Sequence, residues 1–206
     1  MARRYPAALR AVWLPAITVA VLGSASPAAA QMIFLNHSVK FVCGTQLPAP
    51  NLPGEPVVKP GNYATEINIH NIQFSQQPAI KSLVLVVKDG EPIGREPRVQ
   101  PPSPFLVVQM PPRNAMMDDC NQIWEMAFPG GPPPPNPMPL TIGYLSIISL
   151  MELDVDAVYT AQSFLSTTAD PQDSPSIDVE RVLAKRLSTT GAAAAMSALR
   201  ESREPR

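Results

Sequence analysis

The chain has 206 residues, enough for one domain with a sizeable core, and its 16 Lys and Arg against 17 Asp and Glu give a net charge of −1. A near-neutral chain without a basic stripe lacks the positive charge that phosphate neutralisation requires, so we expect no nucleic-acid partner. Proline is abundant, with 26 residues. Because proline interrupts helices and strand ladders, it predicts many irregular connections.

The beginning of the chain has the layout of a secretory signal peptide. Three arginines and no acid come first, and a mostly apolar, uncharged run follows over residues 11–25. Ala28 and Ala30 then occupy the small-residue positions of a cleavage site ahead of Gln31. The apolar run is shorter than the roughly 20 residues that span a membrane. We therefore expect residues 1–30 to be removed on export to the periplasm or medium, with no transmembrane segment afterwards.

Short segments rich in β-branched residues follow along the chain and are predicted to be strands. They cover residues 38–43, 63–71, 80–89, 105–110, 115–120, 140–149, 153–162 and 176–182. Several alternate between apolar and polar residues; Val155 and Ala157, for example, alternate with Asp154 and Asp156. This pattern predicts an all-β fold, a single antiparallel β-sandwich of immunoglobulin-like or jelly-roll-like type over residues 31–184.

The segments between the predicted strands are rich in proline and are expected to be long loops. The proline clusters lie at residues 46–61, 91–104, 110–112 and 128–139. Only two places favour a helix: a turn at residues 121–126, and the Ala-rich stretch at residues 192–199. The tail that contains this stretch, residues 185–206, is basic and low in complexity. We expect the tail to be disordered or a frayed helix.

Two cysteines remain after the predicted cleavage, Cys43 and Cys120. In an oxidising compartment a lone pair of cysteines predicts a disulfide, which would stabilise the fold by roughly 4 kcal/mol in the chain-entropy model. The alternative is that both are free and fill apolar space. The acidic neighbours Asp118 and Asp119 disfavour a nucleophilic thiolate at Cys120.

Several phrases of the sequence are distinctive. They include KFVCG at 40–44, PGNYATEINIHN at 60–71, GEPIGREPR at 90–98, MDDC at 117–120, IGYLSIIS at 142–149, LDVDAVYTA at 153–161 and SIDVERV at 176–182. In these phrases the chain resembles a family of small exported bacterial proteins to which no biochemical function is assigned. The resemblance spans residues 40–182 and implies a single β-sandwich domain. It implies no active site.

Four acidic residues form the main candidate for a chemical site. Asp154 and Asp156 share one face of a predicted strand about 7 Å apart, and Asp178 and Glu180 repeat that spacing. If the two strands are neighbours, the four acids converge, and they could hold a cation or act as a hydrolase pair. The favoured alternative is a solvated outer face that discourages aggregation.

Other residue types predict no catalytic centre. The two histidines, His37 and His70, lack the spacing of metal ligands, and the serines and glycines match no nucleophile elbow or phosphate loop. We therefore expect no metal, no cofactor and no enzymatic activity. The aromatic residues predict core packing, with an exposed binding row as the alternative. These are Tyr63, Trp124, Phe128, Tyr144 and Tyr159.

Three functions remain open at this point. The first is an exported, non-enzymatic protein that acts in binding or assembly, through its Pro-rich loops or a sheet edge, with an envelope or extracellular protein or a second copy as partner. The second is a carbohydrate- or ligand-binding envelope module. The third is a hydrolase that uses the four acids. An exposed aromatic platform would favour the second, and a pocket uniting the acids would favour the third.

Overall fold

The computed structural model describes residues 33–48, 57–163 and 175–202. The expected signal peptide, residues 1–30, and the expected cleavage point before Gln31 lie outside these ranges. Within the described ranges, no helix has both the length and the apolar character needed to cross a membrane.

The described part of the chain consists of ten strands and two helices. In chain order these are β1 (Leu35–Gln46), β2 (Gly61–His70), β3 (Gln77–Lys88), β4 (Glu91–Pro92), β5 (Leu106–Met110), β6 (Ala115–Asp118), α1 (Cys120–Ala127), β7 (Thr141–Ser149), β8 (Asp154–Ser163), β9 (Ser176–Arg181), β10 (Lys185–Arg186) and α2 (Thr189–Glu201). All eight predicted strand segments are strands, and every pairing between named strands is antiparallel. The prediction of an all-β fold is confirmed.

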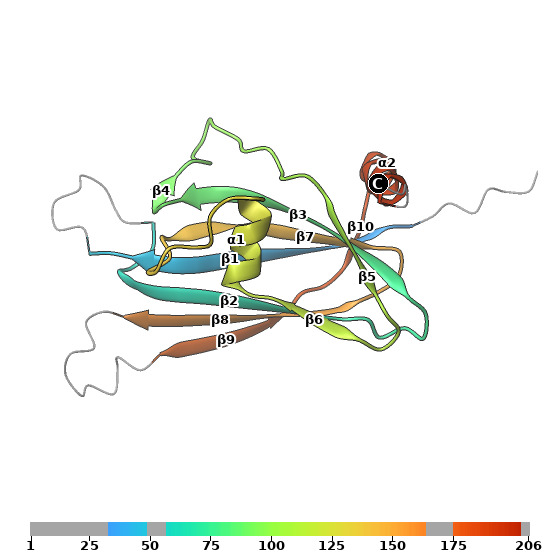
Figure 1. Cartoon of the computed structure of the whole chain (residues 1–206), viewed down its shortest axis with the longest axis horizontal. Coiled ribbons are helices and arrows are strands. Elements are labelled where there is room, and N and C mark those ends of the chain that lie inside the picture. The colour runs from blue at the N-terminus through green and yellow to red at the C-terminus, as the bar shows by residue number, and fades with distance from the viewer. Residues whose placement is uncertain (1–32, 49–56, 164–174, 203–206) are drawn as a thin grey trace, which may run out of the picture. The chain divides into compact units, whose positions relative to one another are not determined.

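Hydrogen bonding joins the strands into one open sheet with the order β4-β3-β7-β1-β2-β8-β9. β5 pairs with β3, β6 with β2 and β10 with β1. β1 connects two groups of strands, because its first part pairs with β7 and its last residues, from Gly44 to Gln46, pair with β2. In Figure 1, β3, β7 and β1 run along one side and β2, β8 and β9 along the other. Because the sheet is continuous, the finer expectation of two separate sheets stays a prediction.

Gly44 lies where β1 changes partner, and only glycine fits there. Its φ is +95°, and a Cβ at this position would collide with the carbonyl oxygen of Pro139. The neighbouring Thr45 donates its backbone N–H to the carbonyl of Met138 at 2.8 Å. The chain before β7 therefore approaches β1 closely at the point where the sheet bends from one group of strands to the other.

The core contains side chains from both groups of strands. It includes Val39 and Phe41 of β1, Leu83 of β3, Leu145 and Ile147 of β7, Ile67 and Ile69 of β2, Val155 and Ala157 of β8, and Ile123 of α1. The alternation predicted for β8 is confirmed, since Val155 and Ala157 are buried while Asp154 and Asp156 are partly exposed. Burying each large aliphatic side chain contributes about 1.5–3 kcal/mol.

Helix α1 is fastened at its first turn. The carboxylate of Asp119 caps it by accepting the backbone N–H groups of Asn121 and Gln122, both at 2.9 Å. Cys120, the first residue of the helix, forms a disulfide with Cys43 of β1, and their Cα atoms are 5.6 Å apart. The predicted disulfide is therefore confirmed, and it ties α1 to the strand that connects the two groups.

The C-terminal tail differs from its prediction. The helix favoured at residues 192–199 is present as α2, residues 189–201, capped by Ser188, but it is docked on the sheet instead of frayed or disordered. The apolar side of the helix packs on the outer face of the sheet, in a cluster of Phe34, Ile80, Ile148, Ala195, Ala198 and Leu199. Lys185 and Arg186, also assigned to the tail, form β10 against β1. The composition of the tail is low in complexity, but the surface that binds it comes from distant strands.

Candidate functional site

The four acidic residues singled out in the sequence do not converge. β8 and β9 are neighbours, as that hypothesis requires, but their register places Asp156 opposite Arg181 and Tyr159 opposite Asp178. Since directly opposed residues share a face, Asp154 and Asp156 lie on one face of the sheet and Asp178 and Glu180 on the other. The hypothesis that the four acids together form a cation site or a hydrolase pair is therefore wrong.

Each acidic pair has its own surroundings. On the outer face, the carboxylate of Asp154 forms an ion pair with the guanidinium of Arg181, and Nη2 and Oδ1 are 2.9 Å apart. On the opposite face, Oε2 of Glu180 lies 3.3 Å from the hydroxyl oxygen of Tyr159, within hydrogen-bond distance. The Asp154–Arg181 pair is largely exposed, and pairs of this kind contribute little stability. Among the described residues, no group of three or more His, Cys, Asp and Glu side chains is arranged to hold a metal ion.

The two histidines lie on different strands of the sheet. His37 of β1 is fully buried opposite Ile147, whereas His70 ends β2 opposite Asp154. Nδ1 of His37 has no hydrogen-bond partner, and burial lowers the pKa of this imidazole below its ordinary value. His37 therefore favours the neutral form.

The aromatic side chains do not form an open row. Tyr63 donates to the carbonyl of Lys59 at 2.6 Å, and Tyr159 donates to the carbonyl of Lys40 at 3.0 Å. The rings of Trp124 and Phe128 are 4.5 Å apart. Nε1 of Trp124 also donates to the carbonyl of Pro132 in the Pro-rich loop. Tyr144 is the one of the five predicted residues that is exposed, so these aromatics provide no stacking platform.

The strand β9 forms an edge of the sheet, and all six of its residues are exposed. Two apolar side chains, Ile177 and Val179, are 69% and 62% exposed. Among the described residues, β8 is the only strand that pairs with β9. The outer edge of β9 is therefore open to another strand.

One hydrogen bond fixes which backbone groups of β9 point outward. The N–H of Val182, just after β9, donates to the carbonyl of Val155 in β8 at 2.8 Å. In an antiparallel ladder, successive residues direct their N–H and C=O groups alternately toward the neighbouring strand and away from it. Ile177, Val179 and Arg181, at odd-numbered positions, therefore direct these groups away from β8.

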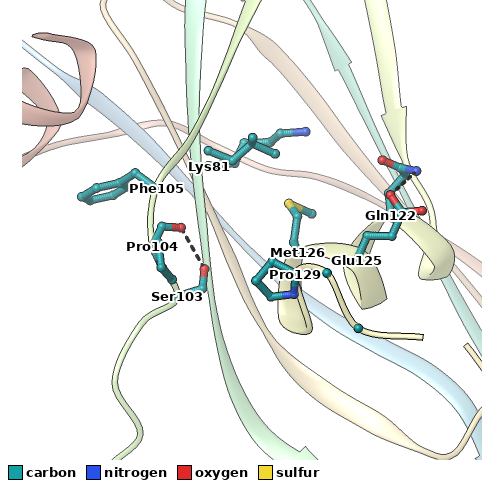
Figure 2. Close-up of a pocket in the computed structure, with 11 residues that line it drawn as sticks. Lys81, Ser103, Pro104, Phe105, Gln122, Glu125, Met126 and Pro129 are labelled. Carbon is teal, nitrogen blue, oxygen red and sulfur yellow. Dashed lines mark hydrogen bonds between the residues drawn. The ribbon is translucent and has the colours of Figure 1, made fainter. Parts of the chain in front are cut away.

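A cleft that the sequence analysis missed lies between α1 and the chain leading into β5 (Figure 2). Its volume is about 550 Å³. It is lined by Lys81, Ser103, Pro104, Phe105, Leu106, Gln122, Glu125, Met126, Pro129, Gly130 and Gly131. Lys81 is buried and forms a bidentate ion pair with Asp118, at 2.7 and 3.0 Å. A lysine in the apolar run of β3 is the one sequence signal that pointed here.

Comparison with protein-family models, with curated proteins and with solved structures found no match for the chain. The resemblance to a family of small exported bacterial proteins therefore stays a prediction, and the functional argument depends on the geometry.

Proposed function

We propose that this chain is an exported, non-enzymatic protein that binds an extended segment of another polypeptide by strand addition at the outer edge of β9. The observation that carries the proposal is the open edge itself, with its outward backbone groups and two exposed apolar side chains, Ile177 and Val179. Exposed edge strands of this kind are templates for pairing with another chain.

The edge lacks some of the devices that prevent unwanted pairing and has others. β9 contains no proline, no lysine and no bulge in its register with β8, but three of its six residues are charged, namely Asp178, Glu180 and Arg181. Its outer face carries Ile177 and Val179 beside the half-buried Val158 of β8. An added strand would gain main-chain hydrogen bonds along the edge and apolar contact on this face. Alternate side chains would determine which segments bind.

Charge indicates what the partner strand contains. Asp178 and Glu180 lie on the face opposite Ile177 and Val179, so a complementary strand alternates basic and apolar residues. A second copy of β9 is a poor partner, because the face-matched antiparallel registers that align five of its six residues place Asp178 opposite itself or opposite Glu180. Like charges in directly opposed positions are destabilising. We therefore infer a basic, extended segment of a different protein.

Export is part of the same proposal. It is supported by the layout of residues 1–30 and by the disulfide between Cys43 and Cys120, since disulfides persist in oxidising compartments. The non-enzymatic assignment is supported by the separation of the acidic pairs on opposite faces of β8 and β9.

The test is calorimetric titration with a short N-acetylated peptide that alternates lysine and valine. We expect it to bind the wild-type protein, and we expect a peptide of the same length that alternates glutamate and valine not to bind. Val179→Pro removes an outward N–H without touching the ladder to β8, so it should abolish binding while the protein stays folded. Val179→Thr keeps that N–H and is the matched control, which should bind as the wild type does.

Two results would contradict the proposal. One is equal affinity of the Val179→Pro and Val179→Thr variants for the lysine–valine peptide. The other is equal binding of the two oppositely charged peptides, which would mean that Asp178 and Glu180 do not select the partner.

A further inference from the structure

The cleft between α1 and the chain leading into β5 is separate from the β9 edge and shares no residue with it. We propose that it binds a small, uncharged amphiphile, with an apolar body in the cleft and a carbonyl or hydroxyl oxygen that accepts a hydrogen bond from Lys81. The cleft volume of about 550 Å³ lies within the range of about 300–1,000 Å³ that is usual for small-molecule sites.

Both walls of the cleft are held in place by the fold. On one side, Ser103 donates its backbone N–H to the carbonyl of Leu83 at 2.7 Å, and its hydroxyl accepts the N–H of Leu83 at 3.0 Å. On the other side, the disulfide at Cys120 and the cap at Asp119 fix the start of α1. The cleft is therefore formed without a ligand, which lowers the entropic cost of binding one.

The apolar lining comes from both walls. Phe105 and Leu106 stand on the strand side and remain 41% and 46% exposed, while Met126 faces them from α1. Figure 2 shows Phe105 and Met126 on opposite sides of the space, with Lys81 between them and Pro129 near Met126. Apolar side chains that stay exposed on two facing walls provide a surface for the apolar body of a ligand.

The polar part of the site is a buried ion pair with hydrogen-bonding capacity left over. An ammonium group has three N–H donors, and the hydrogen bonds of Lys81 Nζ within the described residues all go to the two carboxylate oxygens of Asp118. A third donor is therefore available for an acceptor on a ligand. Lys81 and Asp118 are 4% and 3% exposed, so an unmet donor at this position carries a desolvation penalty that a ligand oxygen would relieve.

The charges around the cleft select an uncharged head group. The ammonium of Lys81 is already matched by Asp118, so a carboxylate on the ligand would meet that carboxylate as a like charge. Asp118 lies behind Lys81 and is not part of the lining, whereas Glu125 is an acid on the lining itself, where it accepts a hydrogen bond from Gln122. A cationic head would meet the ammonium of Lys81. An amide, ester or alcohol avoids both repulsions and supplies the acceptor.

The experiment measures the fluorescence of N-phenylnaphthylamine, an uncharged apolar dye that would occupy the apolar part of the cleft, with the disulfide-bonded protein. We expect enhanced fluorescence with the wild-type protein and displacement by octanamide. Octanoate and octylammonium have the same chain length and differ in charge, and each should require a concentration roughly tenfold higher. Absence of enhancement with the wild type, or displacement by octanoate at the lowest concentration, would overturn the proposal.

Variants separate the cleft from other apolar surface. Met126→Trp fills the space, and Leu106→Glu places a charge at an exposed position of the wall; both should abolish the fluorescence enhancement. Because Leu106 also lines a second cleft beside α2, Met126→Trp is the variant specific to this cleft. Val99→Trp, in an exposed loop outside the cleft, is the matched control and should bind the dye as the wild type does. Wild-type binding by folded Met126→Trp and Leu106→Glu proteins would place the dye elsewhere and refute the site.

The role of the ion pair has its own variant. The double change Lys81→Met with Asp118→Leu removes both charges together, so no buried charge is left unpaired. This protein should still bind the dye but should lose its preference for octanamide over octanoate. Retention of the full preference would show that Lys81 does not contact the head group. Val179→Pro at the β9 edge should leave all of these measurements unchanged.

Discussion

The hydroxyl of Tyr159 donates a hydrogen bond of 3.0 Å to the backbone carbonyl of Lys40, although 119 residues separate them in the chain. Tyr159 lies on β8 and Lys40 on β1, and these strands are separated by β2 in the order of the sheet. The bond therefore connects the two groups of strands directly. Oε2 of Glu180 in β9 lies 3.3 Å from the same hydroxyl and competes for its single proton, which brings the edge strand into this connection.

The hydroxyl of the half-buried Tyr159 predicts that the free energy of unfolding decreases at alkaline pH. Burial, with the charge of Glu180 second, raises the pKa of Tyr159 from 10.0 to about 12. Since the unfolded chain ionises first, the stabilisation is complete below pH 10 and is lost as the pH rises from 10 through 12. Urea midpoints across this range should fall more steeply for the wild type than for Tyr159→Phe. Tyr144→Phe, at an exposed tyrosine, should keep the wild-type slope, and identical slopes for all three proteins would contradict the argument.

The strands of this fold are predictable because their signal is local. Period-2 alternation and β-branched composition locate β8 within one residue of its observed ends, and two cysteines in a chain that is expected to be exported predict the bridge between Cys43 and Cys120. The register between β8 and β9 has no such local signal. A shift by one residue moves every side chain to the other face, and this is why the acidic residues did not converge.

The incorrect prediction for the tail and the failure to predict the cleft have the same cause. Ala195 and Ala198 of α2 are buried only because Phe34, Ile80 and Ile148 form a surface on distant strands, and no pattern within the tail contains that information. Likewise, the sequence shows a charge, Lys81, within the apolar run of β3. It does not show that Asp118 is its partner, because Asp118 is brought near by the pairing of β6 with β2. Both features depend on how the strands pair.

Removing one member of the buried ion pair should be costly. Lys81→Met leaves the carboxylate of Asp118 buried without a partner and should lower the free energy of unfolding by roughly 3–5 kcal/mol. The double variant Lys81→Met, Asp118→Leu should recover most of that loss, because matched apolar side chains need no desolvation of charge. Urea denaturation of the single and double variants measures both. A double variant as unstable as the single one would show that the pair stabilises the fold.

The two faces of β8 should respond differently to substitution. Val155 is 1% exposed, so Val155→Asp buries an unpaired carboxylate. This change should lower the free energy of unfolding by at least about 3 kcal/mol, or prevent folding. Asp156→Ser, on the partly exposed face, should cost less than about 1 kcal/mol. Thermal denaturation of the two variants compares the faces, and similar decreases in Tm would contradict the observed alternation.

His37 predicts a loss of stability in mild acid. Burial lowers its pKa below the ordinary value of 6.5, so the unfolded chain takes up the proton more readily than the folded one. Its contribution is complete above pH 6.5 and is lost as the pH falls below that value. His37→Met should remove this part of the pH dependence between pH 6.5 and about 5, before most carboxylates titrate. Parallel pH profiles for the variant and the wild type would exclude His37 as the cause.

Amide hydrogen exchange of the wild-type protein, with and without the lysine–valine peptide, tests strand addition at β9 most directly. We expect the outward amides of Ile177, Val179 and Arg181 to gain protection when the peptide is bound. The amides of Asp178 and Glu180, already bonded to β8, should change little. Protection at other surfaces with none at Ile177 and Val179, or no difference between the two states at saturating peptide, would contradict the assignment of β9 as the binding edge.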